Sequence, residues 1–302
     1  MLLALTLTAS LAVLAAPAGA AGSARVHAPA AGATASSIAA EEARVAAYWT
    51  PERMRATPPL DGPTAADPLA TTSFAPVPDA TLPPYAVNGR IFVRQGRNAG
   101  FCSGTAINSP TRRLVLTAGH CVNSGPRGIR GTSAWSRFMQ FVPAYTDGSA
   151  PYGVFIARRP EIFASKAWAE TGNPNYDIGA FLVGTNELGQ NVADAVGGGV
   201  TIALDRPRKE QFQSFGYPGR VRQLQQCDSP STGDDRFTYT IPGPPTLKIR
   251  CHWLPGASGG GWLINGGTEI NGLTSYGRNS DKTHTFGPYF SKRTVGPLVA
   301  GL

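Results

Sequence analysis

The sequence of 302 residues is poor in charge and in long apolar runs, and each shortage excludes a class of protein. Only 15% of the residues are charged, and the 27 Lys and Arg residues are scattered without a recognition motif, so we expect no nucleic-acid partner. After the first twenty residues, no stretch has the roughly 18 apolar residues that a membrane span needs. We therefore expect no stable membrane association once a signal peptide is removed.

Long amphipathic helical patterns are also scarce. The 36 glycines and 26 prolines make up about a fifth of the chain, which argues against helical bundles and coiled coils. From residue 85 onward, short β-rich runs alternate with Gly, Asn, Asp and Pro, a texture typical of β-sandwiches and β-barrels. The predicted strands include 90–93, 113–116, 178–183, 200–204, 237–241 and 262–264.

The first twenty residues contain no charged side chain and are rich in Leu and Ala. Small residues, Ala18 and Ala20, occupy the positions that a signal peptidase reads, so residues 1–20 are predicted to be a secretory signal peptide. No Lys or Arg precedes the apolar run, which leaves an uncleaved membrane anchor as the alternative. The signal peptide predicts a secreted, extracellular protein.

The cysteine content is low and fits export. Disulfides form in secreted proteins, and four cysteines allow three connectivities. We favour local pairing, one bond in each half of the chain. A zinc site is the alternative, because His120 and His252 each adjoin a cysteine, but no spacing matches a zinc motif. No metal and no cofactor is predicted, and the expected pairs are Cys102–Cys121 and Cys227–Cys251.

The chain divides by composition near Tyr85. Residues 21–84 are rich in Ala and Pro, with one predicted helix over 36–49 and nine prolines in 51–84, and form a predicted prosegment and linker without a core of its own. Net charge is −2 before Tyr85 and +10 from there on. The prosegment is therefore a candidate inhibitor or folding aid, or a passive spacer. The basic domain has a solvated surface or contacts an anionic cell wall.

Three short motifs supply a base, an acid and a nucleophile. His120 ends an apolar run, Asp177 begins a buried strand, and Ser258 stands in the glycine-rich loop 256–261. Serine becomes a strong nucleophile when a neighbouring imidazole takes its proton, and an acid orients that imidazole. The N–H groups of Gly256 and Ser258 are the expected oxyanion donors. The alternative acids are Asp147, Asp194 and Asp205.

The segments 117–121, 177–180 and 256–260, in this order, resemble the chymotrypsin-like (trypsin-fold) serine endopeptidases, near the secreted bacterial and glutamyl-endopeptidase-like members. The resemblance implies an all-β fold of two antiparallel six-stranded β-barrels, about 85–195 and 200–302, with the active site between them and a short C-terminal helix. It also implies polypeptide substrates, a Ser-His-Asp triad and an acyl-enzyme intermediate.

Further segments match the same family. Residues 101–107 resemble the strand that carries one cysteine of the first pair, and 287–290 resemble the segment that closes the pocket for the side chain before the scissile bond, the S1 pocket. Residues 272–277 resemble the strand that binds substrate backbone. The implied substrate-binding residues are Ser275, Tyr276 and Gly277, with His252 in the S1 pocket.

Three departures from the family pattern limit the specificity that can be predicted. Ala257 stands where trypsin-type enzymes have an aspartate that binds the N-terminal amine freed by activation. Arg90 is therefore not expected to be an activation site. Mature forms that start between residues 78 and 86 are expected to be equally active. His252 replaces an acid, which puts a pocket for Lys or Arg in doubt. Thr274 replaces the histidine of glutamyl endopeptidases, leaving His252 or His284 as substitutes.

Two other functions use the same residues. The pattern Gly256-x-Ser258-x-Gly260 also fits α/β-hydrolases, but those require an acid and then a histidine downstream, here only Asp281 and His284, and alternating strands and helices. A catalytically inactive binding module with a protease fold is the second alternative. Labelling of Ser258 by a serine-directed reagent would distinguish it from an enzyme.

Overall fold

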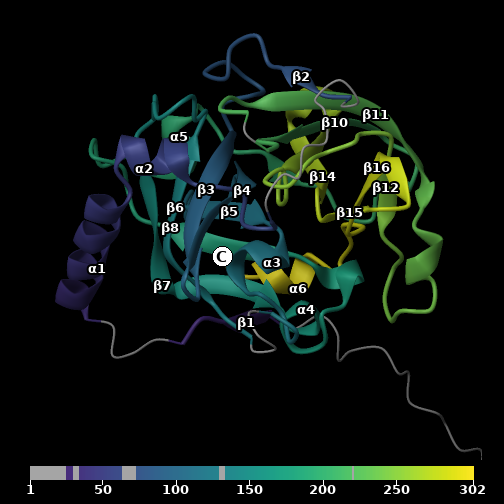
Figure 1. Ribbon diagram of the computed structural model, residues 1–302, viewed down its shortest axis with the longest axis horizontal. Coiled ribbons are helices and arrows are strands. Elements are labelled where there is room, and N and C mark those ends of the chain that lie inside the picture. The colour runs from purple at the N-terminus through teal and green to yellow at the C-terminus, as the bar shows by residue number, and fades with distance from the viewer. Residues whose placement is uncertain (1–24, 30–33, 63–72, 129–132, 220) are drawn as a thin grey trace, which may run out of the picture.

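The computed structural model describes residues 25–29, 34–62, 73–128, 133–219 and 221–302, and Figure 1 shows two β-sheets side by side with few helices. This confirms the predicted all-β fold class and excludes the alternating pattern of an α/β-hydrolase. The predicted signal peptide, residues 1–20, lies outside the described residues. Within the described part of the chain, no helix is long and apolar enough to cross a membrane.

The first sheet is a closed barrel. Its strands run in the order β7-β6-β3-β4-β5-β8, and β8 pairs back onto β7 to close six strands. A further strand, β1, pairs with the C-terminal end of β7, at residues 163–165. Strand bounds are β1 Arg25–His27, β3 Asn88–Gln95, β4 Asn98–Ala106, β5 Leu114–Thr117, β6 Ser136–Pro143, β7 Phe155–Ser165 and β8 Gly179–Val183.

The second sheet is larger than the six strands expected. Eight strands run in the order β15-β16-β12-β11-β10-β13-β14-β9, and β2, from the predicted linker, pairs with β11 as the ninth. The bounds are β2 Ala75–Pro76, β9 Thr201–Ile202, β10 Gln211–Gly216, β11 Gln225–Asp234, β12 Leu247–Ile249, β13 Gly261–Ile264, β14 Glu269–Leu273, β15 Tyr276–Arg278 and β16 Asp281–Gly287.

The helices are short, apart from the first. One 3-10 helix begins where a strand was predicted, over 237–241, so that prediction is wrong. The Asp235 carboxylate accepts from the Phe237 N–H at 3.1 Å and starts the 3-10 turn. The bounds are α1 Ala35–Tyr48, α2 Pro51–Ala56, α3 Gly119–Val122, α4 Lys166–Thr171, α5 Val192–Ala195, α6 Gly296–Val299, η3 Pro174–Tyr176, η4 Arg236–Thr238 and η5 Asn265–Gly267.

Residues 25–29 and 34–60 pack against the first barrel, with α1 on its outer side (Figure 1). Trp49 is buried and its Nε1 donates to the Phe138 carbonyl at 2.6 Å, while Met54 of α2 is 3% exposed and accepts from Gln140. Burial of such large apolar groups stabilises the barrel. The expectation of a linker without its own core therefore misses that these residues share the core of the barrel.

Arg90 is buried in the middle of β3. It is 2% exposed, its guanidinium lies 4.0 Å from the ring centroid of Phe101, and it donates to the Val221 carbonyl at 2.6 Å. Burial lowers the pKa of Arg90 to about 10. The Arg90–Ile91 bond lies inside a paired strand, which fits the expectation that it is not an activation site.

Both predicted disulfides are present. Cys102 pairs with Cys121 over a separation of 19 residues, and Cys227 pairs with Cys251 over 24 residues. The first joins β4 to α3 in the first barrel, and the second joins β11 to the segment after β12 in the second sheet. Each bond therefore fastens one half of the molecule.

We expect the double replacement Cys227→Ser/Cys251→Ser to lower the free energy of unfolding by about 3 kcal/mol, because the bond limits the entropy of the unfolded chain. The bond that the matched variant Cys102→Ser/Cys121→Ser removes closes a loop of similar length, so this variant should lose a similar amount of unfolding free energy. Urea denaturation followed by tryptophan fluorescence measures both. A loss below about 1 kcal/mol in either variant would contradict this account of the bond.

Candidate active site

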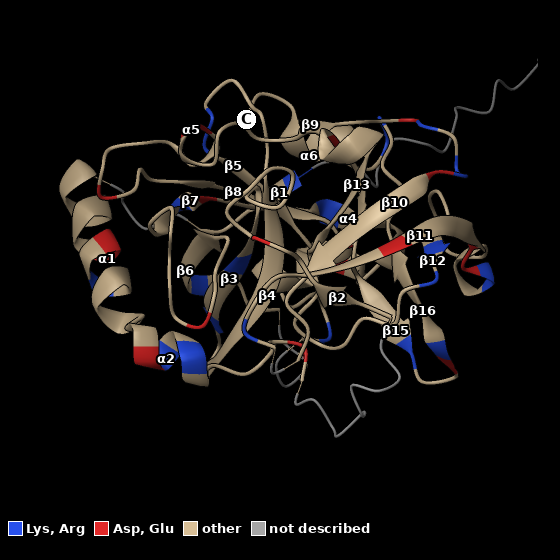
Figure 2. Ribbon diagram, turned by 90° about the horizontal axis from the view of Figure 1, so that it is seen from above, with Lys and Arg blue, Asp and Glu red and all other residues tan. Residues whose placement is uncertain are grey.

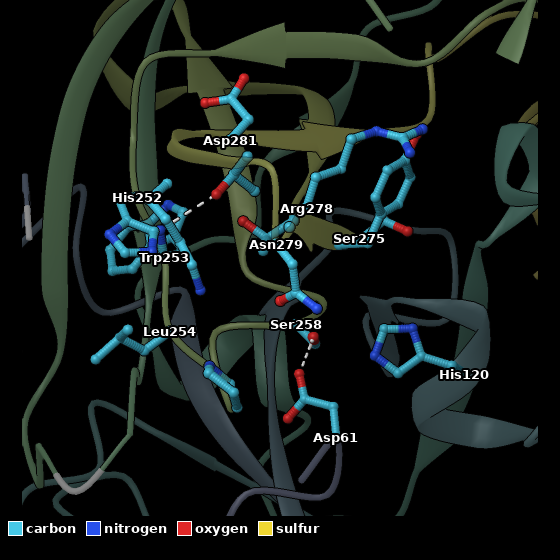
Figure 3. A pocket seen from close by; sticks show the side chains of 16 residues that line it. Asp61, His120, His252, Trp253, Leu254, Ser258, Ser275, Arg278, Asn279 and Asp281 are labelled. Carbon is cyan, nitrogen blue, oxygen red and sulfur yellow. Dashed lines mark hydrogen bonds between the residues drawn. The ribbon is translucent and has the colours of Figure 1, made fainter. Parts of the chain in front are cut away.

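Two of the three predicted catalytic residues, His120 and Ser258, line one cavity of about 520 Å³, and the third, Asp177, is hydrogen-bonded to His120. His120 comes from α3 and Asp177 from the turn between η3 and β8, both in the first barrel, whereas Ser258 comes from the loop between β12 and β13 of the second sheet. His120 and Ser258 both line the cavity (Figure 3). The site therefore lies where the two halves of the chain meet.

Asp177 holds His120 by two hydrogen bonds. The Nδ1 of His120 lies 2.8 Å from Oδ2 of Asp177, and the backbone N–H of His120 donates to Oδ1 at 2.8 Å. Ser275 adds a third bond from its Oγ to Oδ2 at 2.5 Å. Asp177 is 2% exposed, so these donors compensate for the burial of a charged group. The carboxylate thus fixes the ring of His120 and selects a proton on Nδ1.

The electrostatics favour the protonated form of His120. Burial alone would lower the pKa of the imidazole, but the charge and the hydrogen bond of Asp177, together with the charge of Asp61, outweigh it and raise the pKa of His120 above 6.5. The Nε2 atom is buried and has no hydrogen-bond partner among the described residues. It is therefore available to a group that enters the cavity.

Ser258 is not bonded to His120. Its Oγ donates instead to Oδ2 of Asp61 at 2.6 Å, and the same carboxylate accepts from the Gly256 N–H through Oδ1 at 2.8 Å (Figure 3). Asp61 belongs to the predicted prosegment and was not among the candidate residues. Its carboxylate thus accepts from the N–H of Gly256, one of the two predicted oxyanion donors.

The segment before Asp61 is held by backbone hydrogen bonds. The Leu60 N–H donates to the Phe101 carbonyl at 2.9 Å, and the Phe101 N–H donates to the Pro58 carbonyl at 3.0 Å. Pro59 and Phe101 form a parallel bridge. Asp61 therefore reaches the cavity from a short extension beside β4.

The loop that carries Ser258 is fastened to the first barrel. Ser103 of β4 donates from Oγ to the Gly256 carbonyl at 2.9 Å and from its N–H to the Ser258 carbonyl at 2.8 Å. Gly256 has φ +95°, and a Cβ there would lie 2.4 Å from the Phe101 ring, so glycine is required. The loop is already formed in the full chain, although the buried Ala257 offers no carboxylate for an N-terminal amine.

The predicted substrate-binding residues lie along the same cavity. Strand β15 is at the edge of the second sheet, and its Gly277 leaves open space, since a Cβ there would meet nothing within 4 Å. The Tyr276 hydroxyl donates to Asp235 at 2.6 Å, and burial raises the pKa of Tyr276 above its ordinary value. Ser275 bonds to Asp177, so its side chain supports the acid rather than facing open space.

The histidine positions differ in their surroundings. His252 lines the cavity, is 8% exposed, and its Nδ1 has no partner among the described residues. Thr274, at the position where glutamyl endopeptidases carry histidine, also lines the cavity, and its Oγ1 accepts from Trp262 Nε1 at 3.0 Å. His284 Nδ1 lies 2.9 Å from Asp281, in an exposed hairpin.

One group of potential metal ligands is found among the described residues, formed by Cys102, His120 and Cys121. The two cysteines are bonded to each other, so neither offers a thiolate. The adjacency of cysteine and histidine in the sequence is thus explained by a disulfide beside the histidine.

Two solved structures are similar to this chain over most of their length. The protease Anisep from Arthrobacter nicotinovorans is 32% identical, and the match covers 72% of this chain and 96% of that chain at a TM-score of 0.62. A thermostable serine protease, AL20, from an extremophilic microorganism is 30% identical and matches 70% of this chain and 95% of that chain at a TM-score of 0.61.

Curated relatives match less of the chain. The extracellular metalloprotease of Bacillus subtilis is 29% identical over 113 residues, and serine protease 23 of Mus musculus is 25% identical over 178 residues. The matches cover 37% and 54% of this chain, and 30% and 43% of those proteins, so this chain spans less than half the length of either. No family model matches the sequence.

We expect the imidazole of His120 to titrate with a midpoint above 6.5, and Asp177→Asn to move that midpoint down, because the replacement removes the charge that raises the pKa. NMR of ¹⁵N-labelled histidine in the full chain measures both. The ion pair then stabilises the fold fully below pH 6.5, and this contribution is lost as the pH rises through the folded pKa.

A remote replacement serves as the control. Asp194 binds Arg112 on the surface, so Asp194→Asn should leave the titration of His120 unchanged. An unchanged midpoint in Asp177→Asn would show that Asp177 does not set the pKa of His120.

Proposed function

Because the chain belongs to the chymotrypsin-like serine endopeptidases, we propose that it hydrolyses peptide bonds with Ser258 as nucleophile, His120 as general base and Asp177 as the orienting acid. The observation that carries this proposal is the 2.8 Å contact between His120 Nδ1 and Asp177. It leaves the His120 Nε2 atom without a partner among the described residues, and Ser258 lines the same cavity as His120. The oxyanion donors are the N–H groups of Gly256 and Ser258.

The reaction follows from these positions. When a peptide enters, Ser258 Oγ attacks the carbonyl carbon while His120 Nε2 takes the hydroxyl proton. The electron pair of the carbonyl moves to its oxygen, which accepts from the Gly256 N–H. The imidazolium then gives the proton to the leaving amine, and the C–N bond breaks to leave an acyl-enzyme. Water, activated by the same imidazole, releases the acid and restores Ser258.

We further propose that the full chain is a zymogen that is held inactive by Asp61. The carboxylate engages both Ser258 Oγ and the Gly256 N–H, so a substrate carbonyl cannot reach either group. The bonds of Ser103 to the loop support a site that needs only to be uncovered, not rebuilt. The prosegment is thus the enzyme's own ligand, and polypeptides are its substrates.

The proposed place of action is outside the cell. The two disulfides and the predicted signal peptide support secretion, since disulfides persist in oxidising compartments. Figure 2 shows Lys and Arg on elements of both sheets, and this spread of positive charge supports at most a weak, general attraction to anionic cell-wall polymers.

Replacement of the nucleophile tests the proposal against the inactive binding module. We expect Ser258→Ala or His120→Ala to lower kcat by about 10⁴- to 10⁶-fold, with little further loss when the two are combined, because they act as one unit. A serine-directed phosphonate should label Ser258 and fail to label either variant. The parent for these measurements is the chain with Asp61→Ala, in which the proposed block on Ser258 is absent. A parent that keeps a tenth of its activity without Ser258, or is never labelled, has no such triad.

Replacement of Asp61 tests the zymogen. We expect the full chain with Asp61→Ala to react with the phosphonate at least tenfold faster than the unmodified chain, because a charge-assisted hydrogen bond to Ser258 is lost. Asp79→Ala is the matched control, since Asp79 is an acid of the same predicted prosegment, and its carboxylate accepts from the neighbouring Thr81. Equal labelling rates for all three chains would contradict inhibition by Asp61.

A further inference from the structure

The wall of the cavity on the side away from His120 contains His252 and Trp253 (Figure 3). Trp253 is 6% exposed, and its Nε1 donates to Ser214 Oγ at 2.8 Å. One face of its ring is covered by Phe74, with ring centroids 5.0 Å apart and planes 6° from parallel. Phe74, which precedes the predicted domain boundary at residue 85, therefore packs against Trp253 of this wall.

Ser73 holds the neighbouring part of the same wall. The His252 backbone N–H donates to Ser73 Oγ at 2.8 Å, and that oxygen lies 3.7 Å from Cys227 Sγ. Ser73 itself is exposed, but its hydroxyl is the acceptor of this partly buried N–H and so ties the chain at His252 to the segment before β2. Neither Ser73 nor Phe74 lines the cavity itself.

The segment that carries these two residues is part of the second sheet. Ala75 and Pro76 of β2 pair with β11, and the Val77 N–H donates to the Leu224 carbonyl at 3.2 Å. In Figure 1, β2 lies along β11, far from α1. Composition alone assigned residues 73–77 to the prosegment, but their contacts are those of the catalytic half.

We propose that Ser73 and Phe74 are positioning residues that set the S1 wall through His252 and Trp253, and that the functional enzyme begins upstream of Ser73. This inference rests on the proposed function. Asp61 and Ser73 then have opposite effects, because the first blocks Ser258 and the second supports the pocket beside it. The activating cut that we propose falls between them. Removal of the chain as far as residue 84 would strip the wall of Ser73 and Phe74, so mature forms that start between residues 78 and 86, which the sequence led us to expect to be equally active, should instead lose their substrate preference.

The test uses the full chain with Asp61→Ala as parent and peptide anilides that differ only in the residue before the scissile bond. We expect Phe74→Ala to raise KM by about threefold to tenfold, with kcat nearly unchanged, and to alter the order of preference among the substrates, because a stacked ring no longer holds Trp253. Phe74→Tyr keeps the ring and should restore the parent profile.

Two further variants separate positioning from general stability. Ser73→Ala removes the acceptor for His252 and should change the preference in the same way, whereas Ser73→Thr keeps a hydroxyl and should not. Leu82→Ala is the matched control, because Leu82 is an exposed apolar residue further along the same segment. A small phosphonate with no side chain for the S1 pocket should label Ser258 at the parent rate in every variant.

The outcomes are distinct. If Phe74→Ala keeps the full substrate profile of an active, labelled parent, the inference is overturned alone. If it lowers kcat equally for every substrate and slows labelling, the ring is only a structural support, and the inference is again overturned. A parent that neither hydrolyses peptides nor takes the label overturns the proposed function, and this inference with it.

Discussion

The arrangement of the two halves depends on the buried carboxylate of Asp177. A charge in this position is tolerated only when donors surround it. Two donors come from His120 in the first barrel, and the third is Ser275, which precedes β15 of the second sheet. One carboxylate therefore orients the imidazole and also holds Ser275, at the start of the predicted substrate-binding strand. The contact between the halves and the geometry of the site thus depend on the same group.

A second tie makes the site rigid before it is needed. Ser103, one residue after Cys102 in β4, bonds to the carbonyls of Gly256 and Ser258 in the loop of the other half. Because this loop needs no N-terminal amine to hold its shape, our zymogen proposal rests on occupation of the site and not on a collapsed loop. The carboxylate of Asp61, bonded to Ser258 Oγ and to the Gly256 N–H, is the group that we propose for this role.

The local motifs predicted three residues that the structure brings together, since Asp177 is bonded to His120, and His120 and Ser258 line one cavity. Their catalytic roles stay a prediction. The disulfide pairs were predicted from spacing, because the two cysteines of each pair lie close together in the sequence. Asp61 could not be found this way, since it meets Ser258 across 197 positions and a proline-rich composition gives no sign of the pairing with Phe101. The same composition gave no sign of strand β2, because its two residues form a strand through pairing with β11, far along the chain.

The group that Asp61 presents to Ser258 explains how a chain that carries a nucleophile can hold part of itself in the site without being cut. A carboxylate carbon is a poor electrophile, because its negative charge is shared between two oxygens and there is no amine to leave. The Ser258 proton is donated to that carboxylate rather than to His120. The contact therefore lacks both requirements of the proposed reaction, an electrophilic carbonyl and a base bonded to the nucleophile, while it occupies the Gly256 N–H, one of the two proposed oxyanion donors.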